Sequence, residues 1–223
     1  IKEEGIVAEI VTKFSFDRMY DEEYFVSLLF YMGLLTIERQ EKTRLFLKIP
    51  NYVIKTIMWE YIETNLKKEY KINLDLNELR KTIEEMAYEG RIKPYIEYIS
   101  QNVLKVLSNR DIINFDEKYI KVILITYLVN SKAYRPISER ETEGGYIDIY
   151  LERDIRIPDI KYEWLIELKY VKKSEKDKVD KIKEEGIKQL KRYRESKGLK
   201  ERKDVKQALI IFIGKDEYQV IEV

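Results

Sequence analysis

The stretch YEWLIELKY, residues 162–170, has the pattern of a buried β-strand that carries two charges. Its alternate apolar positions are expected to share one face of a sheet: Trp164, Ile166, Leu168 and Tyr170. Glu167 and Lys169 then emerge together on the opposite face. Burying a carboxylate and an ammonium without partners is costly, so these two charges require an explanation.

A second acid stands in the preceding predicted strand, GGYIDIYL, residues 144–151, where Asp148 is expected on a face with Tyr146 and Tyr150. If the two strands are neighbours about 5 Å apart, Asp148 and Glu167 converge on one cation. Two carboxylates with water and a substrate phosphate are a usual Mg²⁺ arrangement. Lys169 would then orient the attacking water or stabilise charge on the phosphate. The alternative is a plain Glu167–Lys169 salt bridge at a strand edge, which spacing alone slightly favours.

The sequence around these two strands, in the second half of the chain, predicts the order helix, three strands, helix, two strands. The segments are a helix over 116–131, a short strand in 134–143, strands in 144–154 and 162–171, a helix over 174–196 and a hairpin over 206–223. Ser174 is expected to start the long helix, and Gly214 and Lys215 to turn the hairpin. This order fits an α/β (α+β) fold with a mixed sheet flanked by helices.

The first half predicts a helix over 21–31, two strands within 34–51 and a helix over 52–70, which is the outline of a winged-helix-like region. Nucleic-acid contact is one reading of it. A packing or linking role is preferred, because the apolar faces are wide and the basic residues scattered. Two further helices follow, with Asn77 as the expected N-cap. We expect two domains, 1–74 and 75–223.

Composition excludes several kinds of chemistry. The 223 residues contain no cysteine and no histidine. Disulfides, thiol chemistry, imidazole bases and the usual zinc ligands are therefore absent, and oxygen ligands favour Mg²⁺, Mn²⁺ or Ca²⁺. The sequence has no Gly-rich phosphate loop, signal peptide or apolar run long enough for a bilayer, so a cytoplasmic protein is expected. It starts at Ile1 without Met, which suggests a piece of something longer.

Charge is nearly balanced overall, at +1, but unevenly distributed. Residues 171–206 hold 15 Lys and Arg against 8 Asp and Glu. A local excess of this kind attracts phosphate backbones. The alternative, favoured on charge alone, is a solvated helix with opposite-charge pairs.

The ordered set of an acid on one strand, Glu-x-Lys on the next and then a basic helix resembles the PD-(D/E)XK nuclease superfamily. More narrowly, ERETEGGYID, LIELKY and EEGIKQLKRY look like the domain that follows an AAA-type ATPase module in a widespread bacterial family. DEEYFVSLLFYMGLLTI and LKIPNYVI are similar to the region joining those two parts. The resemblance covers nearly the whole chain and is strongest over 139–193.

The resemblance implies a role for six residues. Its strand Asp falls on Asp148 and its Glu-x-Lys on Glu167 and Lys169, with a further acid on Glu141. The Gln and Tyr of the following helix fall on Gln189 and Tyr193, four residues apart on one helix face. The alternatives are a packed helix stripe for Gln189 and Tyr193, and a solvated charge for Glu141.

Two departures from the family pattern concern the rest of the site. Tyr146 stands where the family often has Arg. The preceding helix has Ile120 in place of a His, and its acid matches Glu117 or Asp116 only weakly. Any contact made by the missing Arg or His is therefore in doubt.

The resemblance implies a nuclease that hydrolyses phosphodiester bonds, with Mg²⁺ or Mn²⁺ held by Asp148 and Glu167, with Glu141 as a further ligand, and with Lys169 positioning the water. Nucleic acid is the expected partner, DNA ahead of RNA, together with an AAA-type ATPase module in the same full-length chain and no membrane. The rival hypotheses are a non-catalytic nucleic-acid-binding module and a protein-interaction module on the same fold.

Overall fold

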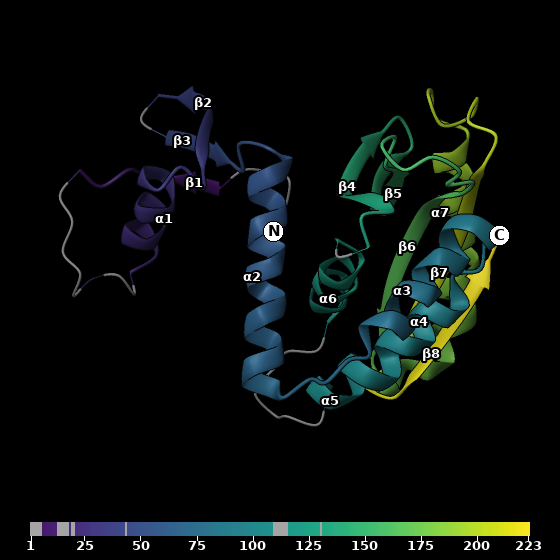
Figure 1. Ribbon diagram of the computed structural model, residues 1–223. Coiled ribbons are helices and arrows are strands. Elements are labelled where there is room, and N and C mark those ends of the chain that lie inside the picture. Colours follow the sequence, from purple (N-terminus) through teal and green to yellow (C-terminus); the bar gives the residue numbers. More distant parts are fainter. Residues whose placement is uncertain (1–5, 13–17, 19–20, 43, 109–115, 130) are drawn as a thin grey trace. The chain divides into compact units, whose positions relative to one another are not determined.

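The computed structural model describes residues 6–12, 18, 21–42, 44–108, 116–129 and 131–223 (Figure 1). By its internal contacts the chain divides into two compact units, Ile1–Tyr61 and Ile62–Val223. The division falls within helix α2 (Tyr52–Tyr70). The domain boundary expected at residue 74 stays a prediction.

The first unit has the predicted order of helix, hairpin and helix. Helix α1 (Glu22–Tyr31) follows Asp21 at the N-cap position, and Gly33 takes a positive φ of 74° just after it. Strands β2 (Thr36–Glu41) and β3 (Arg44–Lys48) form the hairpin, and β1 (Ile6–Ala8) adds a third antiparallel strand in the order β1-β3-β2. The buried residues of this unit include Val26, Leu35 and Leu47.

The second unit is built on a five-stranded mixed sheet. Its strands are β4 (Tyr134–Thr142), β5 (Gly145–Arg153), β6 (Glu163–Val171), β7 (Val205–Ile213) and β8 (Glu217–Glu222), in the order β4-β5-β6-β7-β8. Strands β6 and β7 run parallel, and the other neighbours are antiparallel. The predicted class, a mixed sheet flanked by helices as in restriction endonucleases, is confirmed.

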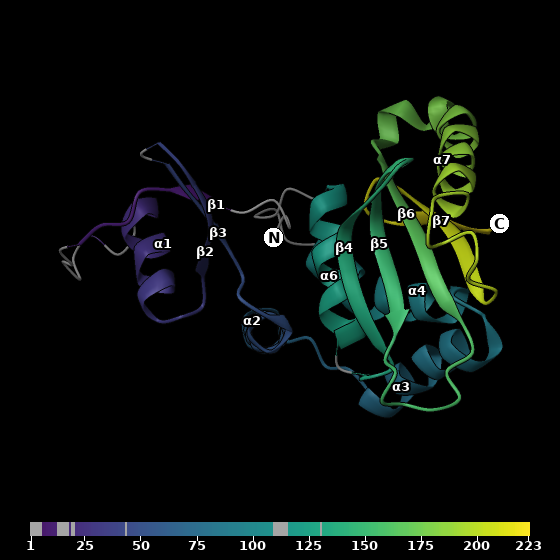
Figure 2. The same cartoon turned by 90° about the horizontal axis from the view of Figure 1, so that it is seen from above.

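Helices cover both faces of this sheet, as Figures 1 and 2 show. In chain order they are α3 (Leu76–Glu84), the π-helical turn η2 (Glu85–Glu89), α4 (Lys93–Ile99), the π-helical turn η3 (Ser100–Leu104), α5 (Lys105–Ser108), α6 (Glu117–Val129), the 3₁₀ turn η4 (Lys173–Lys178) and α7 (Val179–Arg194). Helix α7 lies on one face, against β6 and β7. Helices α3 and α4 lie on the other (Figure 2).

The alternation predicted for residues 162–170 explains this layering. Leu165 belongs to the cluster packed under α7, whereas the neighbouring Trp164 donates its indole N–H to the Met86 carbonyl of η2 at 3.1 Å. Adjacent strand residues point to opposite faces, so the two large side chains anchor opposite layers. Helix α6 joins the layer of α4, because the Tyr95 hydroxyl donates to the Leu124 carbonyl at 2.6 Å.

Two predicted helix starts are wrong. Asp75, not Asn77, caps α3, because its carboxylate accepts the backbone N–H groups of Asn77 and Glu78. The long helix begins at Val179 rather than at Ser174, since Glu175, with φ of −116° and ψ of 22°, interrupts the helical geometry after a 3₁₀ turn. Among the described helices, none is both long and apolar enough to cross a membrane.

Candidate active site

The site lies where β5 and β6 separate. These strands pair at Ile149↔Ile166, Tyr150↔Leu165 and Leu151↔Trp164, and the described pairing stops there. At the next position the Asp148 carboxylate, through Oδ2, accepts the backbone N–H of Leu168 at 2.9 Å. A side chain therefore takes the place of the next ladder hydrogen bond. This contact holds Asp148 between its own strand and the one that carries Glu167 and Lys169.

The pairing of β5 with its other neighbour, β4, is also interrupted at Asp148. Strands β4 and β5 keep one register along their whole length, and the pair Glu139↔Asp148 is the one missing between Ser138↔Ile149 and Arg140↔Ile147. Glu139 has φ of +55°, a left-handed conformation that costs a residue with a side chain about 1–3 kcal/mol. Backbone strain of this kind is often found at functional sites.

The same irregularity changes which side chains share a face. The sequence predicts Ile147 and Tyr150 on opposite faces, because they are an odd number of residues apart. Both instead belong to the buried cluster under α7. That prediction is wrong because regular alternation breaks down around Asp148.

Glu167 is an almost completely buried acid, with 2 % of its surface exposed. Its Oε1 accepts a hydrogen bond from Lys169 Nζ at 2.5 Å, whereas its Oε2 is buried and has no partner within the described structure. Burial and then the charge of Asp148 raise the pKa of Glu167 to about 8, in spite of Lys169. The site thus holds more negative charge than its own cations neutralise.

Lys169 remains an ammonium in this setting. Burial opposes its charge, but the neighbouring Glu167 carboxylate, its hydrogen bond and Asp148 together raise the pKa of Lys169 above its ordinary value. A lysine with a raised pKa donates hydrogen bonds and does not act as a base.

Helix α6 contributes an acid that the sequence left undecided between two residues. Asp116 caps the helix, because its Oδ1 accepts the Tyr119 backbone N–H at 2.8 Å. Glu117 is the one directed to the site, where burial and then the Asp148 charge raise the pKa of Glu117. The backbone N–H of Tyr170, the residue after Lys169, donates to it.

Sequence reasoning missed Lys121 and Glu139. Lys121 is buried on α6 and forms ion pairs with Glu139 of β4 and, at 3.2 Å, with Oδ1 of Asp148. The sequence did contain one signal, because Lys121 is the single charged residue between Ile120 and Val129 of a buried helix. A charge there needs a partner. The sequence offers no comparable signal for Glu139, which falls among several charged residues.

Of the residues predicted on α7, Tyr193 lies beside the site, whereas no hydrogen bond joins Gln189 to the described residues of the site. Tyr193 is buried, and burial and then the charges of Glu167 and Asp148 raise the pKa of Tyr193. Gln189, half-buried one turn earlier, makes no hydrogen bond to the described residues. Glu141 is exposed and accepts from the Tyr146 hydroxyl at 3.5 Å, and no described contact joins it to Asp148 or Glu167.

The donor set fits one hard divalent cation held by two carboxylates. In the described part of the chain, no group of three or more Asp or Glu side chains is gathered closely enough to enclose a metal ion. Mg²⁺, however, is usually held by one or two carboxylates, with water and substrate phosphate completing the shell. The unpartnered Oε2 of Glu167 and the surplus negative charge beside Asp148 supply what such an ion requires.

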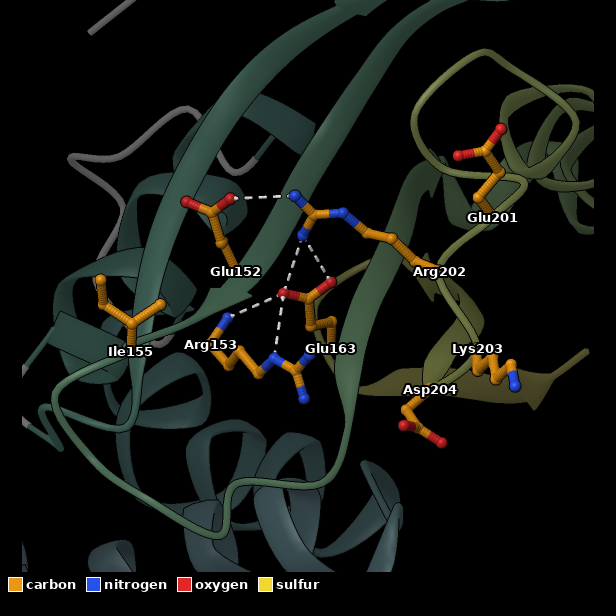
Figure 3. Close-up of a pocket in the computed structure, with 8 residues that line it drawn as sticks. All are labelled: Glu152, Arg153, Ile155, Glu163, Glu201, Arg202, Lys203 and Asp204. Atoms are coloured by element: carbon orange, nitrogen blue, oxygen red, sulfur yellow. Dashed lines mark hydrogen bonds and ion pairs between the residues drawn. The ribbon is translucent and has the colours of Figure 1, made fainter.

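The hollow drawn in Figure 3, with a volume of about 500 Å³, lies at the opposite ends of β5 and β6. Its buried acid, Glu163, is fully engaged: it accepts from Tyr150 at 2.6 Å, from Arg202 at 2.8 and 2.9 Å and from the backbone N–H of Arg153 at 3.3 Å. Burial alone would raise the pKa of Glu163, but these hydrogen bonds lower it below its ordinary value. The pKa of Glu167 is raised instead. We interpret this cluster as structural.

Comparison with known proteins points to the same region. Residues 115–222 match the family model described as the PD-(D/E)XK nuclease superfamily. The matched segment begins just before α6 and ends in β8, so it contains all the residues of the site described above. No curated protein matches the chain.

Proposed function

We propose that this protein is a metal-dependent nuclease that hydrolyses phosphodiester bonds of nucleic acid. The observation that carries the proposal is the buried Glu167, which has an unpartnered oxygen and a pKa raised to about 8, next to Asp148 and an ammonium. Asp148 and Glu167 would hold Mg²⁺ or Mn²⁺. A bound divalent ion would polarise the scissile phosphate and favour ionisation of water.

The side chains of this chain have distinct tasks in that reaction. Lys169, kept as an ammonium by Glu167, orients the attacking water and donates to the oxygen on which negative charge develops. Lys121 and the Leu168 backbone N–H fix the orientation of Asp148. Tyr193 closes the α7 side of the site. The amide of Gln189, which makes no hydrogen bond within the described residues, is available for a hydrogen bond to substrate.

This proposal differs from the sequence-based expectation at Glu141 and Glu117. Glu141 is exposed and is not needed for it, whereas Glu117 lies within electrostatic reach of Asp148. Glu117 would hold a water molecule at the edge of the site rather than a metal ion, since the described acids form no group of three around a common point.

DNA is the proposed substrate ahead of RNA, and the basic stretch 171–206 would attract its backbone. We further propose that the chain is the C-terminal part of a longer cytoplasmic protein with an AAA-type ATPase module. The non-catalytic alternative is a module that binds nucleic acid on the same fold, and the intact set of Asp148, Glu167 and Lys169 favours hydrolysis over it.

The test is a cleavage assay on the whole chain with Mn²⁺ or Mg²⁺ and single- and double-stranded DNA and RNA. We expect metal-dependent cleavage that is lost in Asp148→Ala and falls about 10²- to 10³-fold in Lys169→Met, the scale of removing one donor to a developing charge. Glu141→Gln is the matched control and should cleave like the unmodified chain. Cleavage no greater than that of Asp148→Ala would favour the non-catalytic alternative.

A further inference from the structure

Lys121 and Glu139 form a second charged pair beside Asp148, in addition to the pair of Glu167 and Lys169. Lys121 Nζ lies between two carboxylates, in contact with Glu139 Oε1 and 3.2 Å from Asp148 Oδ1. Its side chain is 10 % exposed, so bulk water screens these contacts little. It occupies the position that a cation bridging Glu139 and Asp148 would take.

The structure around Glu139 is arranged to keep this ammonium in place. Glu139 adopts its positive φ within an otherwise continuous ladder, opposite Asp148. With that backbone distortion its carboxylate meets Lys121 from α6. Asp148 uses Oδ1 for Lys121 and Oδ2 for the Leu168 N–H. The oxygen left without a partner is on the other side, at Glu167 Oε2.

Charge balance agrees with this division of the site. Among the described residues, the acids joined here by contacts or mutual charge effects are Glu117, Glu139, Asp148 and Glu167, and the cations among them are Lys121 and Lys169. With all six groups ionised, the formal charge of the group is −2, which one divalent ion neutralises. A second ion would have to approach the buried ammonium of Lys121, which repels it at close range.

We infer that Lys121, held by Glu139, is a built-in cation that limits this site to one divalent metal ion, bound on the Glu167 side of Asp148. The inference rests on the metal site of the proposed function and adds its stoichiometry. Lys121 is a positioning residue here, since it acts through Asp148 and does not contact the reacting atoms. Replacing it with a neutral side chain should open a second site between Glu139 and Asp148.

The experiment counts bound Mn²⁺ by electron paramagnetic resonance of the free ion, with the whole chain and without nucleic acid. We expect one ion for the unmodified chain, two for Lys121→Met, and one again for the double variant Lys121→Met/Glu139→Gln. Lys121→Arg keeps the charge and should bind one ion. Lys121→Gln provides a second neutral variant if the methionine variant does not fold.

The possible results distinguish a failure of the one-ion limit from a failure of the proposed metal site. Two ions on the unmodified chain, or one ion on both neutral variants with unchanged affinity, would overturn the limit while leaving a metal site. No ion on the unmodified chain would overturn the proposed metal site itself, and the inference with it. Asp148→Ala is the baseline, for which we expect no tightly bound ion.

Discussion

At the scale of single residues, Glu167 connects the electrostatics of the site to metal binding. Its pKa is raised to about 8 because it is buried and lies next to Asp148. A carboxylate must lose its proton before it can ligate a metal ion, so protons compete with metal below that pH. We predict that the affinity for Mn²⁺ rises up to about tenfold per pH unit between pH 6 and 8 and then levels off.

Calorimetric titration of Mn²⁺ at several pH values measures this dependence. Glu167→Gln should bind weakly at every pH, because the amide cannot ionise. Glu141→Gln, which changes an exposed acid, should follow the curve of the unmodified chain. An affinity that is constant from pH 6 to 8 in the unmodified chain would contradict the assignment of Glu167 as a ligand.

The raised pKa of Glu167 also makes the stability of the fold depend on pH. An ordinary ion-paired acid stabilises a protein more as the pH rises, whereas Glu167 should stabilise it less. The folded-state pKa of Glu167 lies above the unfolded value near 4.5, so the folded state binds the extra proton between them. The stabilisation is complete below pH 4.5 and is lost as the pH rises through about 8. We predict that, without metal, Glu167 lowers the free energy of unfolding across this window.

A tenfold difference in proton affinity between the folded and unfolded states corresponds to about 1.4 kcal/mol in the free energy of unfolding. Urea unfolding at pH 5 and pH 9 measures the change, and its comparison with Glu167→Gln isolates this residue from the other titrating groups. The glutamine variant should be the more stable of the two at pH 9. Equal stability of the two proteins at pH 9 would mean that Glu167 is not buried as an uncompensated charge.

At the scale of elements, the close approach of α7 to the sheet sets the position of Tyr193. Gly186 is buried in the middle of α7, and a Cβ added there would lie 2.6 Å from Cδ1 and 2.9 Å from Cδ2 of Leu209 on β7. Leu209 is itself fully buried and has little room to move. We predict that Gly186→Ala destabilises the protein by about 1–3 kcal/mol, the usual cost of overpacking, in spite of the better helix propensity of alanine.

Urea unfolding measures that cost, and a second substitution shows its cause. If the clash with Leu209 is responsible, Leu209→Val should cost less in the Gly186→Ala background than in the unmodified chain. Additive effects would refute the proposed clash. Gly198→Ala is not a matched control, since its φ of +80° introduces backbone strain instead.

The elements themselves were largely predictable, but the geometry of the site was not. Strict alternation in residues 162–170 predicted a strand with Glu167 and Lys169 on one face, because burial imposes a period of two. The sequence could not predict the separation of β5 from β6, since it depends on an Asp148 side chain replacing a backbone partner. Nor could it predict the left-handed Glu139, because local preference favours glycine or asparagine there.

The predictions of where two helices begin were wrong for a related reason. Asn77 was the expected N-cap, whereas the structure uses Asp75, whose carboxylate reaches two backbone N–H groups. Ser174 is a plausible start by composition, yet the regular helix begins after a 3₁₀ turn. Such choices depend on how the chain leaves the preceding strand, which local sequence does not record.

At the scale of the whole molecule, a net charge of +1 conceals a basic segment that leads into and includes α7. Residues 171–206 carry 15 basic and 8 acidic side chains. Some of the basic ones are paired within the segment, as Lys178 is with Glu175 and Lys200 with Glu195. Lys188 and Lys191 are exposed on α7, with no described ion pair. They are therefore available to meet a phosphate backbone.

We predict that binding of the whole chain to duplex DNA weakens steeply with salt and that Lys188→Gln/Lys191→Gln weakens it further. Each lost phosphate contact should reduce the slope of log K against log salt by about 0.9. Fluorescence anisotropy at several salt concentrations, with Ca²⁺ in place of Mg²⁺ to limit cleavage, gives both quantities. The matched control is Lys93→Gln, an exposed lysine on α4 at the opposite face of the sheet. If Lys93→Gln changed the slope as much as the α7 substitutions, DNA would not be recognised by α7, and the local excess of positive charge would be a solvated surface with no role in binding.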